Sequence, residues 1–367
     1  MRDRDYMRMA LEEAVKGEGW TNPNPMVGAV IVKDGRVIGK GFHERYGRLH
    51  AERNAIADCR ESMEGATIYV TLEPCCHHGK QPPCTEAIIR ERFARVVIGS
   101  DDPNPLVAGK GVRILREHGI QVDTGVEKEA CDALNPVFFH YIRTGRPYVA
   151  MKYAMTADGK IATYTGASKW ITGEAARQEV QKARHRYAGI MVGVNTVLAD
   201  DPMLNCRLPG GHSPVRIICD THLRTPLEAQ VVRTAGEIPT ILATACTDED
   251  TQKKYRERGC EVLWIPKKDG HIDLALLMER LGEKKIDSIL LEGGGSLNYS
   301  ALQAGIVNKV QTYLAPKLFG GEGAKSPVAG LGVETPDQAF RLVNRQIREI
   351  GEDVLIEWEV EPCSRES

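Results

Sequence analysis

The stretch that decides the fold runs from His50 to Cys84. It begins His50-Ala51-Glu52 and ends Pro74-Cys75-Cys76-His77-His78-Gly79-Lys80-Gln81-Pro82-Pro83-Cys84. A water-activating zinc site needs three histidine or cysteine ligands, one open coordination position and a nearby carboxylate that is not a ligand. His50, Cys75 and Cys84 can supply the ligands, and Glu52 can supply the carboxylate. The spacing therefore predicts a catalytic zinc centre.

A structural zinc site, or a set of unrelated thiols, is the alternative. A structural site is closed by four protein ligands, and Cys76, His77 or His78 could provide the fourth. That alternative does not explain why Glu52 stands two residues after His50 on the same predicted helical turn. The sequence therefore favours a zinc site that acts on water.

The motif also carries a family resemblance. His-x-Glu followed by Pro-Cys is the signature of the zinc-dependent deaminases. Their second cysteine usually follows after two residues, whereas eight residues separate Cys75 from Cys84. This longer form resembles the deaminase half of the bifunctional deaminase/reductase family of riboflavin biosynthesis. The resemblance implies a cytidine-deaminase-like α/β/α layered fold, one zinc ion per site, and Glu52 as the group that transfers protons.

The same resemblance implies residues that surround the pyrimidine base and the ribose phosphate. A flexible ammonium group such as that of Lys80 suits a phosphate. Asn24 and Asn104 each precede a proline and could instead be turn residues. The expected substrate-binding residues of this half are Asn24, His43, His77, Lys80, Asp102 and Asn104.

Length and composition indicate a protein of two ordinary domains. The chain has 367 residues, 42% of them hydrophobic and 27% charged, with a net charge of -2. That charge gives no surplus for attracting a nucleic-acid backbone. We find no apolar run suited to a signal peptide or a membrane span, and ten cysteines in a chain of this size do not suggest a small disulfide scaffold. We therefore expect a cytoplasmic enzyme of small molecules, without a nucleic-acid or membrane partner.

The first half alternates strand and helix patterns, which predicts helices packed on a mostly central sheet. Asp34-Gly35 is a tight hairpin signal between two strands. Thr144-Gly145-Arg146-Pro147 reads as a linker, so we expect domains at 1–146 and 147–367. Strands are expected at 27–32, 37–41, 67–72, 95–100 and 121–124, and helices at 5–15, 50–60, 85–92, 112–118 and 127–143.

The second half predicts an α/β domain with a largely parallel sheet. Its last two strands are joined by Gly351-Glu352 and should form an antiparallel pair at the end of that sheet. A helix is expected at 173–187, and strands at 148–154, 189–194, 215–219, 240–245, 261–266, 288–291, 311–315, 340–350 and 353–361.

A glycine-rich turn, Glu292-Gly293-Gly294-Gly295-Ser296, follows a predicted strand. Backbone N–H groups in such a turn can approach a phosphate, and the following helix adds positive potential. The turn lacks the G-x-G-x-x-G spacing of a Rossmann fold, and a tight turn without a ligand is the alternative.

Three further segments accompany this turn, namely 168–172, 193–202 and 204–207. With the turn they resemble the reductase half of the same family, which implies a dihydrofolate-reductase-like fold and NADPH as cofactor. The residues implied along NADPH are Ala154, Trp170, Thr172, Thr196, Asp200, Glu292, Gly293, Gly294, Gly295, Ser296, Leu297 and Asn298. Those implied at the sugar phosphate substrate are Lys152, Ser168, Arg184, Leu204, Arg207 and Glu292.

Physical reasons support some of these assignments. The guanidinium groups of Arg184 and Arg207 can bind phosphate in a bidentate manner, although a helical arginine such as Arg184 could also be a solvated surface residue. Asp200 could deliver a proton during hydride transfer, or it could cap the turn at Asp201-Pro202.

The family resemblance implies two consecutive reactions and a homo-oligomer, either a dimer or a tetramer. The first is hydrolytic deamination of 2,5-diamino-6-ribosylamino-4(3H)-pyrimidinone 5′-phosphate, and the second is NADPH-dependent reduction of the ribosyl group to ribityl. Two alternatives stay open at this stage. One is a nucleoside or RNA deaminase whose second half only binds, and the other is a non-catalytic scaffold stabilised by zinc.

Overall fold

The computed structural model describes residues 1–78 and 81–361. They form two compact units, one spanning Met1–Gly145 and the other beginning at Arg146. The division follows Gly145, whose positive φ of 67° ends a helix as left-handed glycines commonly do. Among the described residues, no helix combines the length and apolar character that a membrane span requires.

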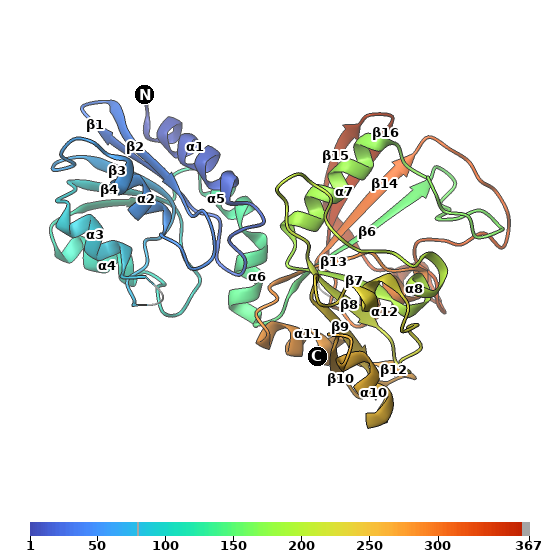
Figure 1. Cartoon of the computed structure of the whole chain (residues 1–367). Coiled ribbons are helices and arrows are strands. Elements are labelled where there is room, and N and C mark those ends of the chain that lie inside the picture. The colour runs from blue at the N-terminus through green and yellow to red at the C-terminus, as the bar shows by residue number, and fades with distance from the viewer. Residues whose placement is uncertain (79–80, 362–367) are drawn as a thin grey trace. The chain divides into compact units, whose positions relative to one another are not determined.

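The first unit is built on a sheet with the strand order β2-β1-β3-β4-β5 (Figure 1). β1 pairs antiparallel with β2 and β3, whereas β3, β4 and β5 run parallel. The Asp34-Gly35 hairpin is confirmed, since both residues have positive φ. The strands are β1 (Gly28–Lys33), β2 (Arg36–Phe42), β3 (Thr67–Leu72), β4 (Arg95–Ser100) and β5 (Gln121–Thr124).

Helices cover both faces of this sheet. Alternate residues of the strands are buried in two clusters, one that includes α1 and one that includes α2, α3 and α4. Helix α1 lies so close to β1 that a Cβ on Gly28 would fall 1.9 Å from the Ala10 carbonyl oxygen. The predicted layered fold is confirmed. The helices are α1 (Asp3–Ala14), α2 (Ala51–Asp58), α3 (Cys84–Arg90), α4 (Lys110–Glu117), α5 (Lys128–Leu134) and α6 (Pro136–Thr144), and η1 (Val15–Gly17) extends α1 as a 3-10 turn.

The prediction of a single helix at 127–143 is wrong. Two helices, α5 and α6, meet at Asn135-Pro136. Proline has no N–H to continue the helix, and its ring disfavours a helical conformation at the preceding residue. Asn135 instead uses its side chain to hold the backbone of Met26, with hydrogen bonds of 2.8 Å to both its N–H and its carbonyl oxygen.

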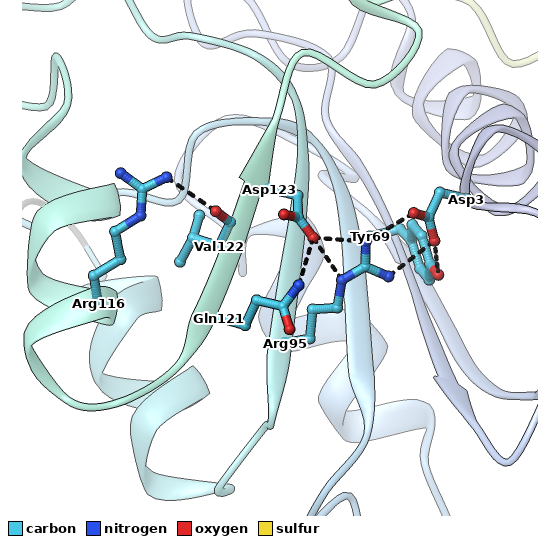
Figure 2. Close-up of polar contacts among 7 residues, drawn as sticks. All are labelled: Asp3, Tyr69, Arg95, Arg116, Gln121, Val122 and Asp123. Carbon is cyan, nitrogen blue, oxygen red and sulfur yellow. Dashed lines mark hydrogen bonds and ion pairs between the residues drawn. The ribbon is translucent and has the colours of Figure 1, made fainter.

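Arg95 ties the strands of the first unit to its N-terminal helix. Figure 2 shows its guanidinium between two carboxylates, with contacts of 2.7 Å to Asp3 and 2.6 Å to Asp123. The Tyr69 hydroxyl donates to Asp3 as well, at 2.7 Å. The hydrogen bonds from Arg95 lower the pKa of Asp3. These groups are partly exposed, so the network contributes on the order of 1 kcal/mol to stability.

The second unit is built on a larger sheet with the order β10-β9-β8-β7-β13-β6-β14-β16-β15 (Figure 1). The first seven strands of this order, from β10 to β14, all pair parallel with their neighbours. β16 pairs antiparallel with both β14 and β15. The predicted antiparallel ending is confirmed. The strands are β6 (Tyr148–Thr156), β7 (Gly189–Gly193), β8 (Val215–Cys219), β9 (Thr240–Thr244), β10 (Glu261–Trp264), β13 (Ser288–Leu291), β14 (Lys309–Ala315), β15 (Leu342–Ile350) and β16 (Asp353–Val360).

The sequence analysis identified α7 (Glu174–Arg186) but did not assign several elements around this sheet. One is α11 (Leu274–Glu283), which buries Leu274, Leu277, Met278 and Leu281 in the core at helical spacing. The others are α8 (Val194–Asp200), α9 (Gln230–Arg233), α10 (Glu249–Arg256), the 3-10 turn η2 (Pro336–Gln338) and the small hairpin β11 (Lys267–Lys268) with β12 (His271–Ile272). The helix expected after the glycine-rich turn is confirmed as α12 (Gly295–Gln303).

Candidate active sites

His50, Cys75 and Cys84 converge in the first unit. Their ligand atoms all lie within 4.8 Å of one another. The His50 Nδ1 atom is 3.4 Å from the Sγ atom of each cysteine. A tetrahedral zinc ion with ordinary Zn–S and Zn–N bonds would separate such atoms by about 3.5 Å. The geometry and the soft donor set therefore fit zinc.

Short-range contacts hold each ligand. His50 is the N-cap residue of α2, Cys84 is the first residue of α3, and Cys75 lies in the loop after β3. The backbone N–H of Cys84 donates to the Cys75 sulfur at 3.3 Å. Arg53 on α2 donates to the carbonyl oxygens of Pro82 and Pro83 at 3.2 and 2.8 Å, which fixes the end of the loop.

The three residues considered as a fourth ligand lie elsewhere. Among the described residues, the cluster of possible metal ligands contains His50, Cys75 and Cys84 alone. The Cys76 thiol contacts the Leu106 carbonyl oxygen at 3.6 Å, and exposed His78 lies 3.7 Å from Glu86. His77 lines the adjacent cavity, where its buried Nδ1 has no hydrogen-bond partner within residues 1–78 and 81–361. Three such ligands would leave the fourth position of a tetrahedral zinc ion to a water or a substrate.

Glu52 is 3% exposed and lines the same cavity. Burial raises its pKa, and the charge of Cys75 adds to that effect. The hydrogen bond between the two thiol groups lowers the pKa of Cys75 to about 4. The same hydrogen bond, together with burial, raises the pKa of Cys84. Zinc binds cysteine as the thiolate, so metal binding would release the remaining thiol proton.

The cavity beside the ligands has a volume of about 270 Å³. Asn24 and His43 share one wall, where the Asn24 Nδ2 lies 3.1 Å from the His43 Nε2. The other ring nitrogen of His43 donates to the Leu49 carbonyl oxygen at 2.9 Å, and burial lowers the pKa of His43. His43 is thus a neutral acceptor for the Asn24 amide, which leaves the Asn24 Oδ1 able to accept from a ligand.

Most of the other expected substrate residues line this cavity too. Asp102 is buried, accepts from the Asn104 N–H at 2.8 Å, and has its pKa raised to about 6 by burial. Asn104 is a turn residue, because its Oδ1 accepts from the Leu106 N–H at 3.0 Å. It also lines the cavity. Lys80 lies outside the described residues.

Glu73 is a cavity residue that the sequence analysis missed. Its two carboxylate oxygens accept from the N–H groups of Gly109 and Val112, at 2.9 and 3.2 Å. A Cβ on Gly111 would meet the Pro74 carbonyl oxygen at 2.4 Å, so the two segments touch. The sequence feature that could have identified Glu73 as a cavity residue is its position two residues before Cys75. Tyr46, Arg48 and Gln81 also line the cavity.

The second unit holds a larger cleft of about 1220 Å³. It follows the carboxyl ends of the parallel strands β6, β13, β7 and β8, the edge where α/β sheets bind ligands. The expected residues that line it are Lys152, Ala154, Ser168, Trp170, Thr172, Arg184, Thr196, Asp200, Leu204, Arg207, Glu292, Gly293, Gly294, Gly295, Ser296 and Leu297.

A charged cluster lies at one part of this cleft. Arg184 donates to both carboxylate oxygens of Glu292 at 2.9 Å, and its side chain is 13% exposed, so it is not a solvated surface residue. Burial acts to raise the pKa of Glu292, but Arg184, Lys152 and Arg207 together lower it to about 2. Burial lowers the pKa of Lys152, an effect that the charge of Glu292 opposes.

The glycine turn leads from β13 into α12. A Cβ on Gly295 would lie 2.7 Å from the Ser326 carbonyl oxygen, so a side chain has no room there. A Cβ on Gly294 would lie 3.8 Å from the Thr196 Oγ1, an ordinary van der Waals distance. Asn298 does not line the cleft. It is fully buried behind the turn, where its amide donates to the Pro327 carbonyl oxygen at 2.8 Å.

Asp200 and Asp201 have different surroundings. The Asp201 carboxylate accepts from the N–H of Gln230, the first residue of α9, at 2.8 Å. Asp200 ends α8 and faces the cleft. Lining residues that the sequence analysis missed include Arg177, Asn195, His222, Arg224 and His271.

Comparisons with known families match both units. Residues 147–356 match the family described as "RibD C-terminal domain". Residues 1–100 match the "Cytidine and deoxycytidylate deaminase zinc-binding region".

Relatives extend the match over the whole chain. Riboflavin biosynthesis protein RibD of Actinobacillus pleuropneumoniae is 57% identical over 98% of this chain and 96% of its own length. The structure of Acinetobacter baumannii RibD, form 1, superposes with a TM-score of 0.87 at 35% identity over 98% of this chain and 99% of that one. The Thermotoga maritima diaminohydroxyphosphoribosylaminopyrimidine deaminase/5-amino-6-(5-phosphoribosylamino)uracil reductase gives 0.83 at 38% identity, with 98% and 99% covered.

Proposed function

Because this chain belongs to the RibD family of bifunctional riboflavin-biosynthesis deaminase/reductases, we propose that its two sites divide the family's chemistry between them. The first unit is a zinc-dependent, cytidine-deaminase-like domain and the second is an NADPH-dependent domain of the dihydrofolate-reductase-like fold. The enzyme deaminates the diaminopyrimidinone ribosyl phosphate and then reduces the ribosyl group to ribityl. We place the boundary between the two domains at residues 146 and 147.

In the first unit, His50, Cys75 and Cys84 are the proposed zinc ligands. Bound zinc supplies a water of lowered pKa for hydrolysis. Glu52 would take a proton from the attacking water and pass it to the departing amine, a role that its buried position and raised pKa suit. Asn24, held by neutral His43, accepts from an N–H of the pyrimidine ring. His77, Lys80, Asp102 and Asn104 surround the base and the ribose phosphate.

The observation that supports this assignment best is that buried Glu52 lines the cavity beside His50, Cys75 and Cys84, whose ligand atoms already converge. We expect Glu52→Gln to lower the deaminase turnover roughly 10²- to 10⁴-fold, because the proton transfer is lost while the shape is kept. Bound zinc and NADPH oxidation should remain at the wild-type level. Glu61→Gln, an exposed glutamate of the same unit, is the control. Deamination retained in Glu52→Gln would contradict the assignment.

In the second unit, the cleft holds NADPH beside the sugar phosphate. NADPH supplies the hydride. The glycine turn at 293–295 presents backbone N–H groups and the start of α12 to the pyrophosphate, with Ala154, Trp170, Thr172, Thr196, Asp200, Ser296 and Leu297 along the cofactor. Lys152, Ser168, Leu204 and Arg207 face the substrate, and Arg184 with Glu292 fixes the charged wall. Asn298 supports the turn from behind.

A single reaction tests both halves. Purified enzyme and the diaminopyrimidinone ribosyl phosphate should release ammonia and consume NADPH in equal amounts. Ammonia without NADPH oxidation would contradict the reductase assignment of the cleft. If neither signal appears in a zinc-replete sample, the substrate assignment is wrong.

We propose a homo-oligomer that forms through β15. This edge strand pairs with β16 on one side, and Leu342, Val343 and Ile347 are 39%, 39% and 54% exposed. An exposed, apolar edge strand suits pairing with a second copy of itself. Light scattering should show an assembly that Ile347→Lys dissociates, whereas Leu318→Lys, which replaces an exposed leucine outside the strand, should not. A monomeric wild-type protein would contradict the proposed homo-oligomer.

We also propose a cytoplasmic location. Every cysteine among residues 1–78 and 81–361 is a free thiol, as a reducing compartment favours. Fractionation of cells that express the tagged protein checks this proposal.

A further inference from the structure

One wall of the cleft in the second unit is a segment without helix or strand, residues 168–173. Residues 168–172 all line the cleft, and Ser168, Trp170 and Thr172 among them have proposed ligand contacts. Within residues 1–78 and 81–361, no backbone-to-backbone hydrogen bond holds 168–172. The segment is therefore positioned by side chains that reach it from other elements.

Lys317 holds two carbonyl oxygens of this segment. Its Nζ donates to the Ile171 oxygen at 2.7 Å and to the Trp170 oxygen at 3.2 Å. The Lys317 backbone is fixed in turn, because its carbonyl oxygen accepts from the Ala157 N–H at 2.8 Å. Lys317 follows β14 and Ala157 follows β6, two strands that lie side by side (Figure 1). Lys317 does not line the cleft, so its ammonium group lies behind the wall.

This contact turns two backbone donors toward the cleft. The peptide bonds after Trp170 and Ile171 are trans, and in a trans peptide the C=O and the N–H point to opposite sides. Because both carbonyls point to Lys317, the N–H groups of Ile171 and Thr172 point away from it, to the side of the cleft. Ile171 and Thr172 are 7% and 8% exposed, and neither N–H makes a hydrogen bond to the described part of the chain. A buried N–H without a partner is rare, so this pair indicates a ligand acceptor.

Two further charged side chains hold the end of the segment. Arg177 of α7 donates to the Thr172 carbonyl oxygen at 2.8 Å, and its guanidinium lies 4.7 Å from the centre of the Trp170 ring. Asp353, which begins β16 and is 1% exposed, accepts from the Gly173 N–H at 2.8 Å. The three carbonyl oxygens from 170 to 172 are therefore all bound by cationic side chains from outside the segment.

We propose that Lys317 is a positioning residue of the reductase site. By holding the Trp170 and Ile171 carbonyl oxygens from behind, it presents the N–H groups of Ile171 and Thr172 to an acceptor oxygen of the nicotinamide nucleotide. A charged donor on the carbonyl polarises the peptide and strengthens its N–H as a donor. The inference rests on the proposed cofactor role of the cleft.

Nucleotide binding tests this role. Calorimetry on the full-length enzyme measures the affinity for NADP⁺, which needs no turnover. Lys317→Met removes the ammonium donors and keeps an unbranched chain, so it should weaken NADP⁺ binding roughly tenfold. KM for NADPH should rise by the same factor, with kcat changed by less than about twofold. Lys317→Arg, which keeps a charged donor, should recover most of the affinity.

Lys254→Met is the matched control, because Lys254 is an exposed lysine of α10 that does not line the cleft. It should bind NADP⁺ as wild type does. If Lys317→Met fails to fold, Lys317→Gln, whose shorter amide keeps a neutral donor, should show a smaller loss of the same kind. A Lys317 variant with a lower urea midpoint but unchanged NADP⁺ affinity overturns the positioning role alone. A wild type that does not bind NADP⁺ overturns the cofactor assignment of the cleft as well.

Discussion

The two active sites are built in opposite ways. The deaminase site is a cavity of about 270 Å³ whose three proposed metal ligands come from one stretch of sequence, His50 to Cys84. The reductase site is a cleft of about 1220 Å³ whose walls come from the ends of several strands, from Lys152 to Glu292 and beyond. A metal centre demands close placement of a few atoms, and neighbouring elements provide it most simply. A dinucleotide needs a long surface, which only a whole sheet edge provides.

The largest effect should follow from removing one metal ligand. We expect Cys84→Ala to lose bound zinc and all measurable deamination, because two ligands cannot hold the ion. NADPH oxidation with the deaminated intermediate as substrate should persist. Metal analysis and the two assays check this, with Cys59→Ala, a thiol outside the cavity, as control. Zinc retained in Cys84→Ala would mean that another residue is the ligand.

The wall of the cleft should respond differently. Arg184→Met leaves Glu292 buried and unpaired, so we expect a loss of about 3–5 kcal/mol in the unfolding free energy of the second unit. Reductase kcat/KM should fall while deamination is unchanged. Lys182→Met, on the exposed face of the same helix, controls for the lost charge.

A double variant separates fold from chemistry in the cleft. Arg184→Met with Glu292→Gln removes the unpaired charge and should recover part of the stability without recovering activity. Recovery of both would mean that the pair acts only as packing.

The unfolding free energy of the first unit should depend on pH through Asp102, which lines the deaminase cavity. Its pKa is about 6, above the usual 3.8, so the neutral carboxyl is the form that the folded protein favours. Its stabilising contribution is full below pH about 4 and is lost as the pH rises through 6, a change on the order of 3 kcal/mol. Asp102→Asn should remove this part of the pH dependence of unfolding by urea. An unchanged pH dependence would contradict the assignment.

The smallest effect should come from the network around Arg95 (Figure 2). Asp123→Asn weakens a partly exposed ion pair, so the unfolding free energy of the first unit should fall by less than about 1 kcal/mol. Both activities should stay at the wild-type level, because Asp123 does not line either site. A change in deaminase KM would show that the sheet transmits strain to the cavity.

The same contrast explains what the sequence could predict. The convergence of His50, Cys75 and Cys84 near Glu52 could be predicted from residue chemistry at short spacing. Strands such as 67–72, 95–100 and 215–219 could be predicted from their apolar runs. The helix break at Asn135-Pro136 could have been predicted from proline. The Arg184 and Glu292 pair could not, because 108 residues separate them and only the assembled sheet brings them together.

Asn298 shows the limit of reasoning from a motif alone. It belongs to the glycine-rich segment, yet helix geometry turns it into the core while Ser296 and Leu297 face the cleft. His222 and Arg224 show the converse. They lack a recognisable motif, and their common position emerges once β8 is placed beside β7.

The carboxylate of Glu73 has a practical consequence for engineering. It joins the loop of Cys75 to the segment that contains Gly109 and Val112, and that segment follows Asp102 and Asn104. A transplanted 101–112 loop would have to supply the same two N–H groups, or the buried Glu73 carboxylate would lose both of these hydrogen bonds. Because Glu73 stands two residues before Cys75, an exchange of this loop should be designed together with the segment that carries this proposed zinc ligand.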